Sequence, residues 1–186
     1  SDFHFKIFEI DKGDLFFGYY DVTPFNDSGL MLACAVNSLD KEMNLGFFDL
    51  NNQSSCQFIN FSNTKTWCWQ MGCRLQWLGG SSHKVIYNDI VEDSYGSIVL
   101  DIDTRAKKEI NHPIYCLSKD GTFGLSLNFS RLQRLRPGYG YSLLDKYENT
   151  PDLDKDGIIF VDLVGNTSKL ILSLKEIINF DFDESM

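Results

Sequence analysis

Positive charge, clustered histidine and long apolar runs are scarce in this sequence. Its 186 residues include 17 Lys and Arg against 26 Asp and Glu, which gives a net charge of −9. Nucleic-acid binding needs clustered cations to neutralise phosphates, so the charge argues against a DNA or RNA partner. No run reaches the roughly 18 apolar residues of a membrane helix, and the first residues form no signal-peptide core. We therefore expect no membrane association and a cytoplasmic location.

The sequence also lacks the short motifs that carry metals, nucleotides or activated nucleophiles. Its five cysteines are odd in number and contain no CxxC pair, which argues against a disulfide framework and a zinc ribbon. His4, His83 and His112 are too dispersed to assemble a metal site from local spacing. No phosphate-binding loop, dinucleotide fingerprint or GxSxG motif occurs. Reduced thiols and no resident cofactor are expected.

Short β-branched and aromatic runs bounded by turn residues recur along the whole chain, and helical periodicity is rare. The pattern predicts an all-β fold, with one helical turn near Leu174–Ile178. The expected strands are Tyr19–Thr23, Leu30–Val36, Leu45–Leu50, Cys56–Phe61, Arg74–Leu78, Lys84–Asn88, Ser97–Ile102, Ile114–Leu117, Phe123–Asn128, Gly157–Leu163 and Lys169–Leu172.

An internal repeat narrows the fold class. Three strands begin near Gly46, Gly96 and Gly157, and each ends in Asp followed by an apolar residue. Their spacing lies somewhat above the roughly 40–50 residues of WD40 or kelch blades. The repeat predicts one domain over residues 1–186, a partial β-propeller of about three to four blades, each a four-stranded antiparallel sheet. A β-sandwich is the alternative, because evenly spaced strands also suit that fold.

This blade number has a consequence for assembly. A closed propeller ring needs at least about four blades, so the chain is expected to be a portion of a longer propeller. The open sheets of an incomplete ring need cover from missing blades or from self-association.

An aromatic segment around three tryptophans is the first candidate site. Trp67, Trp69 and Gln70 combine flat aromatic faces with an amide, which suits the stacking and directed hydrogen bonds of a sugar or nucleotide-sugar ligand. The alternative for Trp67 and Trp69 is a place in the core. Trp77, which lies in an expected strand, is assigned to the core.

A basic segment is the second candidate site. Arg131, Arg134, Arg136 and Tyr139 lie close together in an otherwise acidic chain, and guanidinium groups bind carboxylate or phosphate bidentately. Alternation would place Arg134 and Arg136 on one face of an extended segment. An anionic ligand is the functional interpretation. A solvated basic loop paired with nearby acidic residues is the alternative.

Polar residues in other loops complete the candidate set. Tyr20, Asp21, Asn88 and Asp89 are candidates for hydrogen-bonding or acid–base groups, although loop Asp residues often only cap turns.

A calcium loop is a further alternative, because three acidic residues follow the DxDxDG spacing. These residues are Asp152, Asp154 and Asp156. The twelfth position would be Leu163 where a bidentate Glu is needed, so an acidic hairpin is the expected interpretation and no cofactor is assigned.

Several of these segments together resemble a bacterial family of TolB-like and oligogalacturonate-lyase-like β-propellers associated with polysaccharide biosynthesis loci. The resemblance rests on residues 18–25, the Trp67-to-Trp77 segment, residues 87–89, residues 113–115 and residues 131–141. Members are longer, so it concerns their N-terminal part. It implies a propeller with the loop residues Tyr20, Asp21, Trp69, Gln70, Asn88, Asp89, Arg131 and Arg136 near a common funnel. The His-containing motif that holds the metal of lyase-like relatives is absent after Leu174.

The expected function follows from the loops and the resemblance together. It is a propeller domain that binds a carbohydrate-related anionic ligand, a sugar or nucleotide-sugar, in bacterial surface-polysaccharide metabolism. One alternative is a part of a polysaccharide lyase or of a glycosyl-transfer-associated enzyme, for which only the arginine component is visible. A protein-interaction scaffold is the other alternative.

Overall fold

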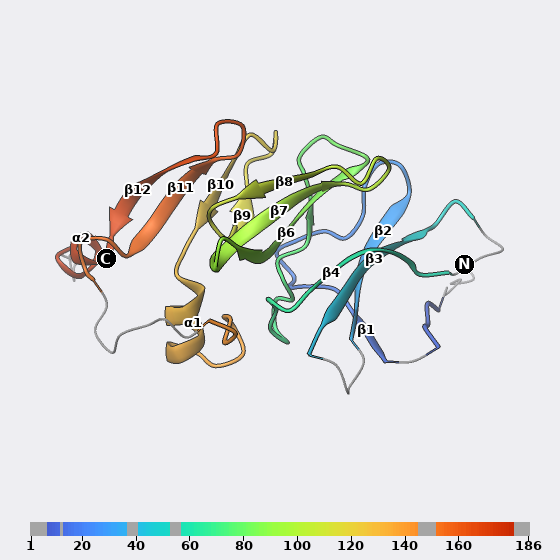
Figure 1. The fold of residues 1–186 in the computed structure, drawn as a ribbon, viewed down its shortest axis with the longest axis horizontal. Helices are drawn as coiled ribbons and strands as arrows, with labels where there is room; N and C mark the ends of the chain where they lie inside the picture. The colour runs from blue at the N-terminus through green and yellow to red at the C-terminus, as the bar shows by residue number, and fades with distance from the viewer. Residues whose placement is uncertain (1–6, 12, 37–40, 53–56, 145–151, 181–186) are drawn as a thin grey trace, which may run out of the picture.

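The strands form three four-stranded antiparallel sheets that follow one another along the chain (Figure 1). The computed structural model describes residues 7–11, 13–36, 41–52, 57–144 and 152–180. In every sheet the spatial order of the strands is their order in the sequence, so each sheet is a simple meander. The all-β prediction and the four-stranded antiparallel repeat unit are confirmed.

The first sheet contains β1 (Asp14–Phe16), β2 (Leu30–Val36), β3 (Met43–Asp49) and β4 (Ile59–Thr64). The second sheet contains β5 (Gln76–Trp77), β6 (Lys84–Val91), β7 (Ser94–Asp101) and β8 (Lys107–Ile110). The third sheet contains β9 (Cys116–Leu117), β10 (Phe123–Ser126), β11 (Gly157–Asp162) and β12 (Thr167–Ser173). Helix α1 (Phe129–Leu135) lies in the connection between β10 and β11, and α2 (Leu174–Ile178) follows β12.

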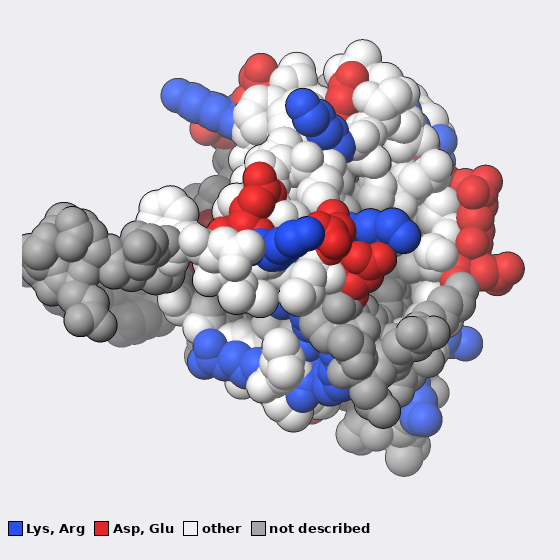
Figure 2. Space-filling view, turned by 90° about the vertical axis from the view of Figure 1, so that its left-hand side faces the viewer, with Lys and Arg blue, Asp and Glu red and all other residues white. Residues whose placement is uncertain are grey.

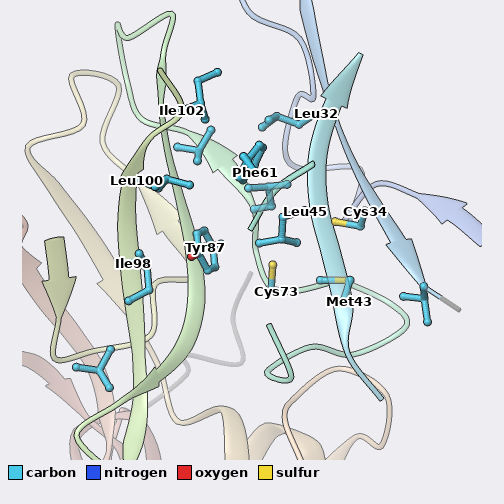
Figure 3. Close-up of a cluster of buried hydrophobic side chains, with 14 residues drawn as sticks. Leu32, Cys34, Met43, Leu45, Phe61, Cys73, Tyr87, Ile98, Leu100 and Ile102 are labelled. Carbon is cyan, nitrogen blue, oxygen red and sulfur yellow. The ribbon is translucent and has the colours of Figure 1, made fainter. Parts of the chain in front are cut away.

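The first and second sheets pack face to face through the main apolar core. Alternation along β2 and β3 points Leu32, Cys34 and Leu45 at the second sheet, where they meet Tyr87 and Leu100 (Figure 3). These side chains are almost completely buried. Full burial of one large apolar side chain stabilises a fold by about 1.5–3 kcal/mol, so this interface accounts for much of the stability. Trp77 packs against the same cluster, as expected for a core residue, and its Nε1 donates to the Pro24 carbonyl at 2.8 Å.

A second core joins the second and third sheets. Ile86 and Ile110 of the second sheet pack with Ile114 and with Val161 of β11. Because successive residues of a strand point to opposite faces, β6 supplies Val85 and Tyr87 to one core and Ile86 to the other. The second sheet is therefore buried on both faces.

The innermost strand of the first sheet is interrupted. Phe16 pairs with Cys34, the chain then leaves the sheet, and it returns where Phe25 pairs with Met31. The excursion, residues 17–23, contains the expected strand Tyr19–Thr23, which is wrong: its residues form a turn in which the Val22 N–H donates to the Tyr19 carbonyl at 3.2 Å. β2 is already paired on both sides of the excursion, so no ladder position is left for it.

The basic segment is also folded differently from the expectation. Residues 129–135 are helical, so the extended segment that would align Arg134 and Arg136 does not exist. The Asn128 side chain caps the helix by accepting from the Arg131 N–H at 2.9 Å. The helix α2 confirms the helical turn expected at the same residues, and a capping box of Ser173 and Glu176 begins it.

No helix in the described ranges is both long and apolar enough to cross a membrane.

Candidate functional site

A groove with a volume of about 810 Å³ lies between the loop that precedes β5 and the loop that follows α1. We call it the tryptophan groove. Its lining combines aromatic, cationic and amide side chains with backbone from two glycines. The lining residues are Val36, Lys41, Lys65, Trp67, Cys68, Trp69, Gln133, Gly138, Gly140, Tyr141, Ser142 and Leu143.

One wall of the groove is the loop that carries Trp67 and Trp69. Reciprocal backbone hydrogen bonds between Cys68 and Gly72, of 3.2 and 2.9 Å, close this loop into a tight turn. The two indole rings meet edge to face with centroids 4.8 Å apart. Trp67 is anchored, since its Nε1 donates to the Lys41 carbonyl at 2.9 Å, whereas Trp69 is 61% exposed. The more exposed indole is therefore the better stacking surface.

The other wall is fixed by Gln133 of α1. Its Oε1 accepts from the backbone N–H groups of Gly138 at 2.9 Å and Gly140 at 3.3 Å. A Cβ at Gly140 would overlap the Phe129 carbonyl oxygen, so glycine is required for the close approach of this loop to the helix. Beneath it, Phe129 and Tyr141 stack with centroids 4.5 Å apart. Both walls thus rest on packed aromatic side chains.

The charge of the tryptophan groove is opposite to that of the whole molecule. Lys41 and Lys65 line it, and its described lining contains no Asp or Glu. In a chain with a net charge of −9, this places a local excess of cations beside two indole faces. Such a lining favours an anionic ligand that also has a flat or apolar face.

A tyrosine cluster lies beside the groove, on the neighbouring loops. Tyr19 is 4.1 Å from Tyr20 and 6.0 Å from Tyr139 between ring centroids. Hydrogen bonds with Tyr139 and then Tyr20 raise the pKa of the Tyr19 hydroxyl to about 12. The Arg136 guanidinium stacks on the Tyr139 ring at 4.0 Å and donates to its hydroxyl at 3.2 Å. Of the expected site residues, Tyr20, Arg136 and Tyr139 therefore come together.

Asp21 serves a contact that links all three sheets. Its carboxylate accepts two hydrogen bonds of 3.0 Å from the buried guanidinium of Arg74. Arg74 Nε also donates to the Tyr115 carbonyl at 2.8 Å, and its guanidinium covers the Tyr115 ring at 4.3 Å. These three residues directly precede or begin the innermost strands of the three sheets.

Arg74 adopts a left-handed backbone conformation, with φ of 57°. A non-glycine residue there costs about 1–2 kcal/mol, which surrounding contacts must offset. Around it the Asn88 N–H bonds the Cys73 carbonyl while Gln76 pairs with Ile86, so Arg74 lies in a bulge of the ladder. The bulge directs its side chain inward. The sequence expectation did not select Arg74, because only this conformation reveals the role.

Asn88 lies in the interior. It is 1% exposed, donates to the Ile114 carbonyl and the Tyr141 hydroxyl, and accepts from Ser97 and the Ile114 N–H. Its amide thus joins the second sheet to the segment that enters the third. Burial raises the pKa of the Tyr141 hydroxyl well above its ordinary value. Asp89 accepts from Thr64 Oγ1 at 2.9 Å and from the neighbouring Ile90 N–H.

The remaining expected residues lie apart from the tryptophan groove lining. Arg131 forms an ion pair with the buried Asp156 at 2.8 Å, which matches the alternative of a basic segment paired with acidic residues. Arg134 and Gln70 are exposed. Gln70 lies close to Gly138 at the groove rim.

The three carboxylates with calcium-loop spacing do not converge. Asp152 pairs with Lys155 at 3.2 Å, Asp154 with Lys175 at 2.9 Å and Asp156 with Arg131. Within the described part of the chain no three His, Cys, Asp or Glu side chains group to hold a metal ion. The structure therefore favours the acidic hairpin over the calcium loop.

Comparison of the chain with protein-family models, curated proteins and solved structures found no match.

Proposed function

We propose that the chain is a portion of a β-propeller and that the tryptophan groove binds a carbohydrate-related anionic ligand, a sugar or nucleotide-sugar that carries carboxylate or phosphate. The observation that carries this proposal is the lining of the groove, which combines Trp67 and Trp69 with Lys41 and Lys65. A role in bacterial surface-polysaccharide metabolism rests on the family resemblance alone.

The architecture supports the propeller half of the proposal. Each sheet is a four-stranded meander, and the sheets succeed one another with their faces packed together. A sandwich with Greek-key connections would instead exchange strands between two sheets. Consecutive meanders are what consecutive blades require.

Each part of the groove has a distinct task in ligand binding. The exposed face of Trp69 stacks on the apolar face of a sugar ring, and the lysine ammonium groups bind the acidic groups. The Ser142 hydroxyl is available at the wall for a sugar hydroxyl. Hydrogen bonds to a charged group contribute about 1.5–3 kcal/mol, so the lysines make acidic ligands bind better than neutral ones.

The test is a titration of the whole chain with an oligogalacturonate, a neutral oligosaccharide of the same length and a nucleotide-sugar, followed by calorimetry. We expect the acidic ligands to bind and the neutral one to bind at least about tenfold more weakly. Trp69→Ala and Lys65→Ala should each weaken binding by about tenfold or more. Lys107→Ala, an exposed lysine on β8, is the matched control and should leave affinity unchanged.

Equal affinity for acidic and neutral ligands, or full affinity in both groove variants, would contradict the proposal. Absorbance from unsaturated uronate products in the same mixtures, with and without manganese, would indicate the lyase alternative.

A further inference from the structure

The three sheets present equivalent pairs of residues to whatever follows them. Relative to the innermost bridge or ladder of each sheet, Leu32 in β2, Ile86 in β6 and Leu125 in β10 hold the same position. Their cross-strand partners are Phe47, Val99 and Phe160. These pairs therefore mark the face that each sheet turns toward the next one.

Two of these three faces are covered. Leu32 and Phe47 pack in the core shared with the second sheet, and Ile86 and Val99 pack in the core shared with the third. No further described strand lies beyond Leu125 and Phe160.

The uncovered face of the third sheet is apolar. Phe123 stacks on Phe160 at 5.0 Å and remains 38% exposed, and Leu172, opposite Ile158, is 36% exposed. Figure 2 views the side of the molecule on which β12 and α2 lie, and uncharged surface extends there between isolated charged side chains. We call the side chains of Phe123, Leu125, Ile158, Phe160 and Leu172 the open face.

The opposite end of the array is closed by its own chain. On the first sheet, the face that points away from the second carries Phe48, and the rings of Phe8 and Phe58 cover it at 4.8 and 5.6 Å. Phe48 is 1% exposed as a result. A second molecule cannot dock its first sheet on the open face without displacing these rings.

We infer that the open face binds the open face of a second copy of this chain, related by a two-fold axis. Such a contact is isologous, so it satisfies both copies and stops at two, whereas head-to-tail docking would extend indefinitely. It continues the sheet-on-sheet packing that already joins the three sheets. Since each copy carries a net charge of −9, mutual repulsion opposes the contact, and added salt should screen it.

The test is sedimentation velocity of the full chain over a concentration series. We expect a species of twice 21.3 kDa, with a dissociation constant that falls as sodium chloride is raised. Phe160→Asp and Phe123→Glu should each weaken association by about tenfold or more, because each buries a charge. Leu135→Asp, at an exposed apolar residue on α1, is the matched control and should leave association unchanged.

Circular dichroism separates loss of association from loss of folding in the variants. If Phe160→Asp unfolds, the surface variant Phe123→Glu decides the question. A wild-type chain of 21.3 kDa at every concentration would overturn the inference, as would a dimer that survives both folded variants. Neither result depends on ligand binding at the tryptophan groove, so the two proposals fail separately.

Discussion

Arg74 has contacts with residues that enter all three sheets, although it is one side chain. Its guanidinium has 1% exposure, its carboxylate partner Asp21 has 32%, and a third contact goes to Tyr115. A buried guanidinium without its partners is strongly destabilising, whereas a surface ion pair contributes little. The value of this contact therefore comes from burial and from its position between sheets.

Replacing Arg74 by Ala should lower the free energy of unfolding by about 2–4 kcal/mol, because it removes the pair and leaves the Tyr115 carbonyl without its donor. Arg74→Lys should recover little, since an ammonium group cannot make the two parallel bonds to Asp21. Urea unfolding measures both effects. Arg136→Ala, which removes an exposed guanidinium, is the control and should change stability by less than about 0.5 kcal/mol. Equal stability of Arg74→Ala and Arg136→Ala would refute the assigned role.

His112 gives stability a pH dependence of defined sign. Burial lowers its pKa below the ordinary value of 6.5, and its Nε2 lies 2.8 Å from Ser168 Oγ. The unfolded chain then binds a proton more readily than the folded one, so this contribution is complete above about pH 6.5 and is lost as the pH falls below that value. Urea unfolding at pH 7.5 and 5.5 should show a smaller loss in His112→Gln than in the wild type. A loss of the same size in both would exclude His112 as its source.

At the scale of elements, alternation and turn chemistry are sufficient to predict most strands but not the connections between sheets. β2 was expected at its observed bounds, because its apolar residues and its turn are local signals. β8 was missed, since its residues Lys107–Ile110 are charged and only the last is buried. Helix α1 was missed because its two arginines suggested a binding strand. Its signals, Asn128 as a cap and apolar residues three apart, are short.

The tryptophan groove could be predicted only in part for a related reason. Trp67 and Trp69 stand out by composition, and they do line the groove. Lys41, Lys65 and Gln133 are ordinary surface residues in sequence, and only the tertiary fold brings them together. Residue type alone cannot separate Asn88, which the interior consumes, from an exposed ligand-binding amide.

Two turns of neighbouring sheets touch through glycine. A Cβ at Gly79, after β5, would overlap the Lys119 carbonyl oxygen in the turn after β9, whereas one at Gly80 would meet nothing within 4 Å. Gly80 has φ of 72°, so its replacement by Ala should cost about 1 kcal/mol from backbone conformation alone. Gly79→Ala should cost more, about 2–3 kcal/mol, because it separates two turns. Thermal or urea unfolding ranks the two variants, and a larger loss in Gly80→Ala would contradict the contact.

At the scale of the whole molecule, stability is distributed unevenly over the array. The second sheet has both faces in apolar cores, whereas β12 is mostly exposed and only its last residue, Ser173, is buried. Arrays of packed repeats gain stability from each interface, so a sheet between two neighbours gains twice.

Hydrogen exchange should follow this distribution. In dilute solution, where copies do not associate, amides of β6 should exchange at least about tenfold more slowly than those of β12. Mass spectrometry of peptides from the two strands measures the difference. Equal protection of both strands would mean that the sheets open together as one cooperative unit.

The interrupted innermost strand of the first sheet has a consequence for sequence change. Phe16 and Phe25, which bracket the excursion, are both held by β2, at Cys34 and Met31. The two anchor points are fixed by pairing on either side, so the length of the excursion is not coupled to the strand register. Residues could be added or removed near Gly18 without shifting any ladder. The loop that carries the tyrosine pair is thus a place where the protein can vary its surface while the sheet beneath it stays the same.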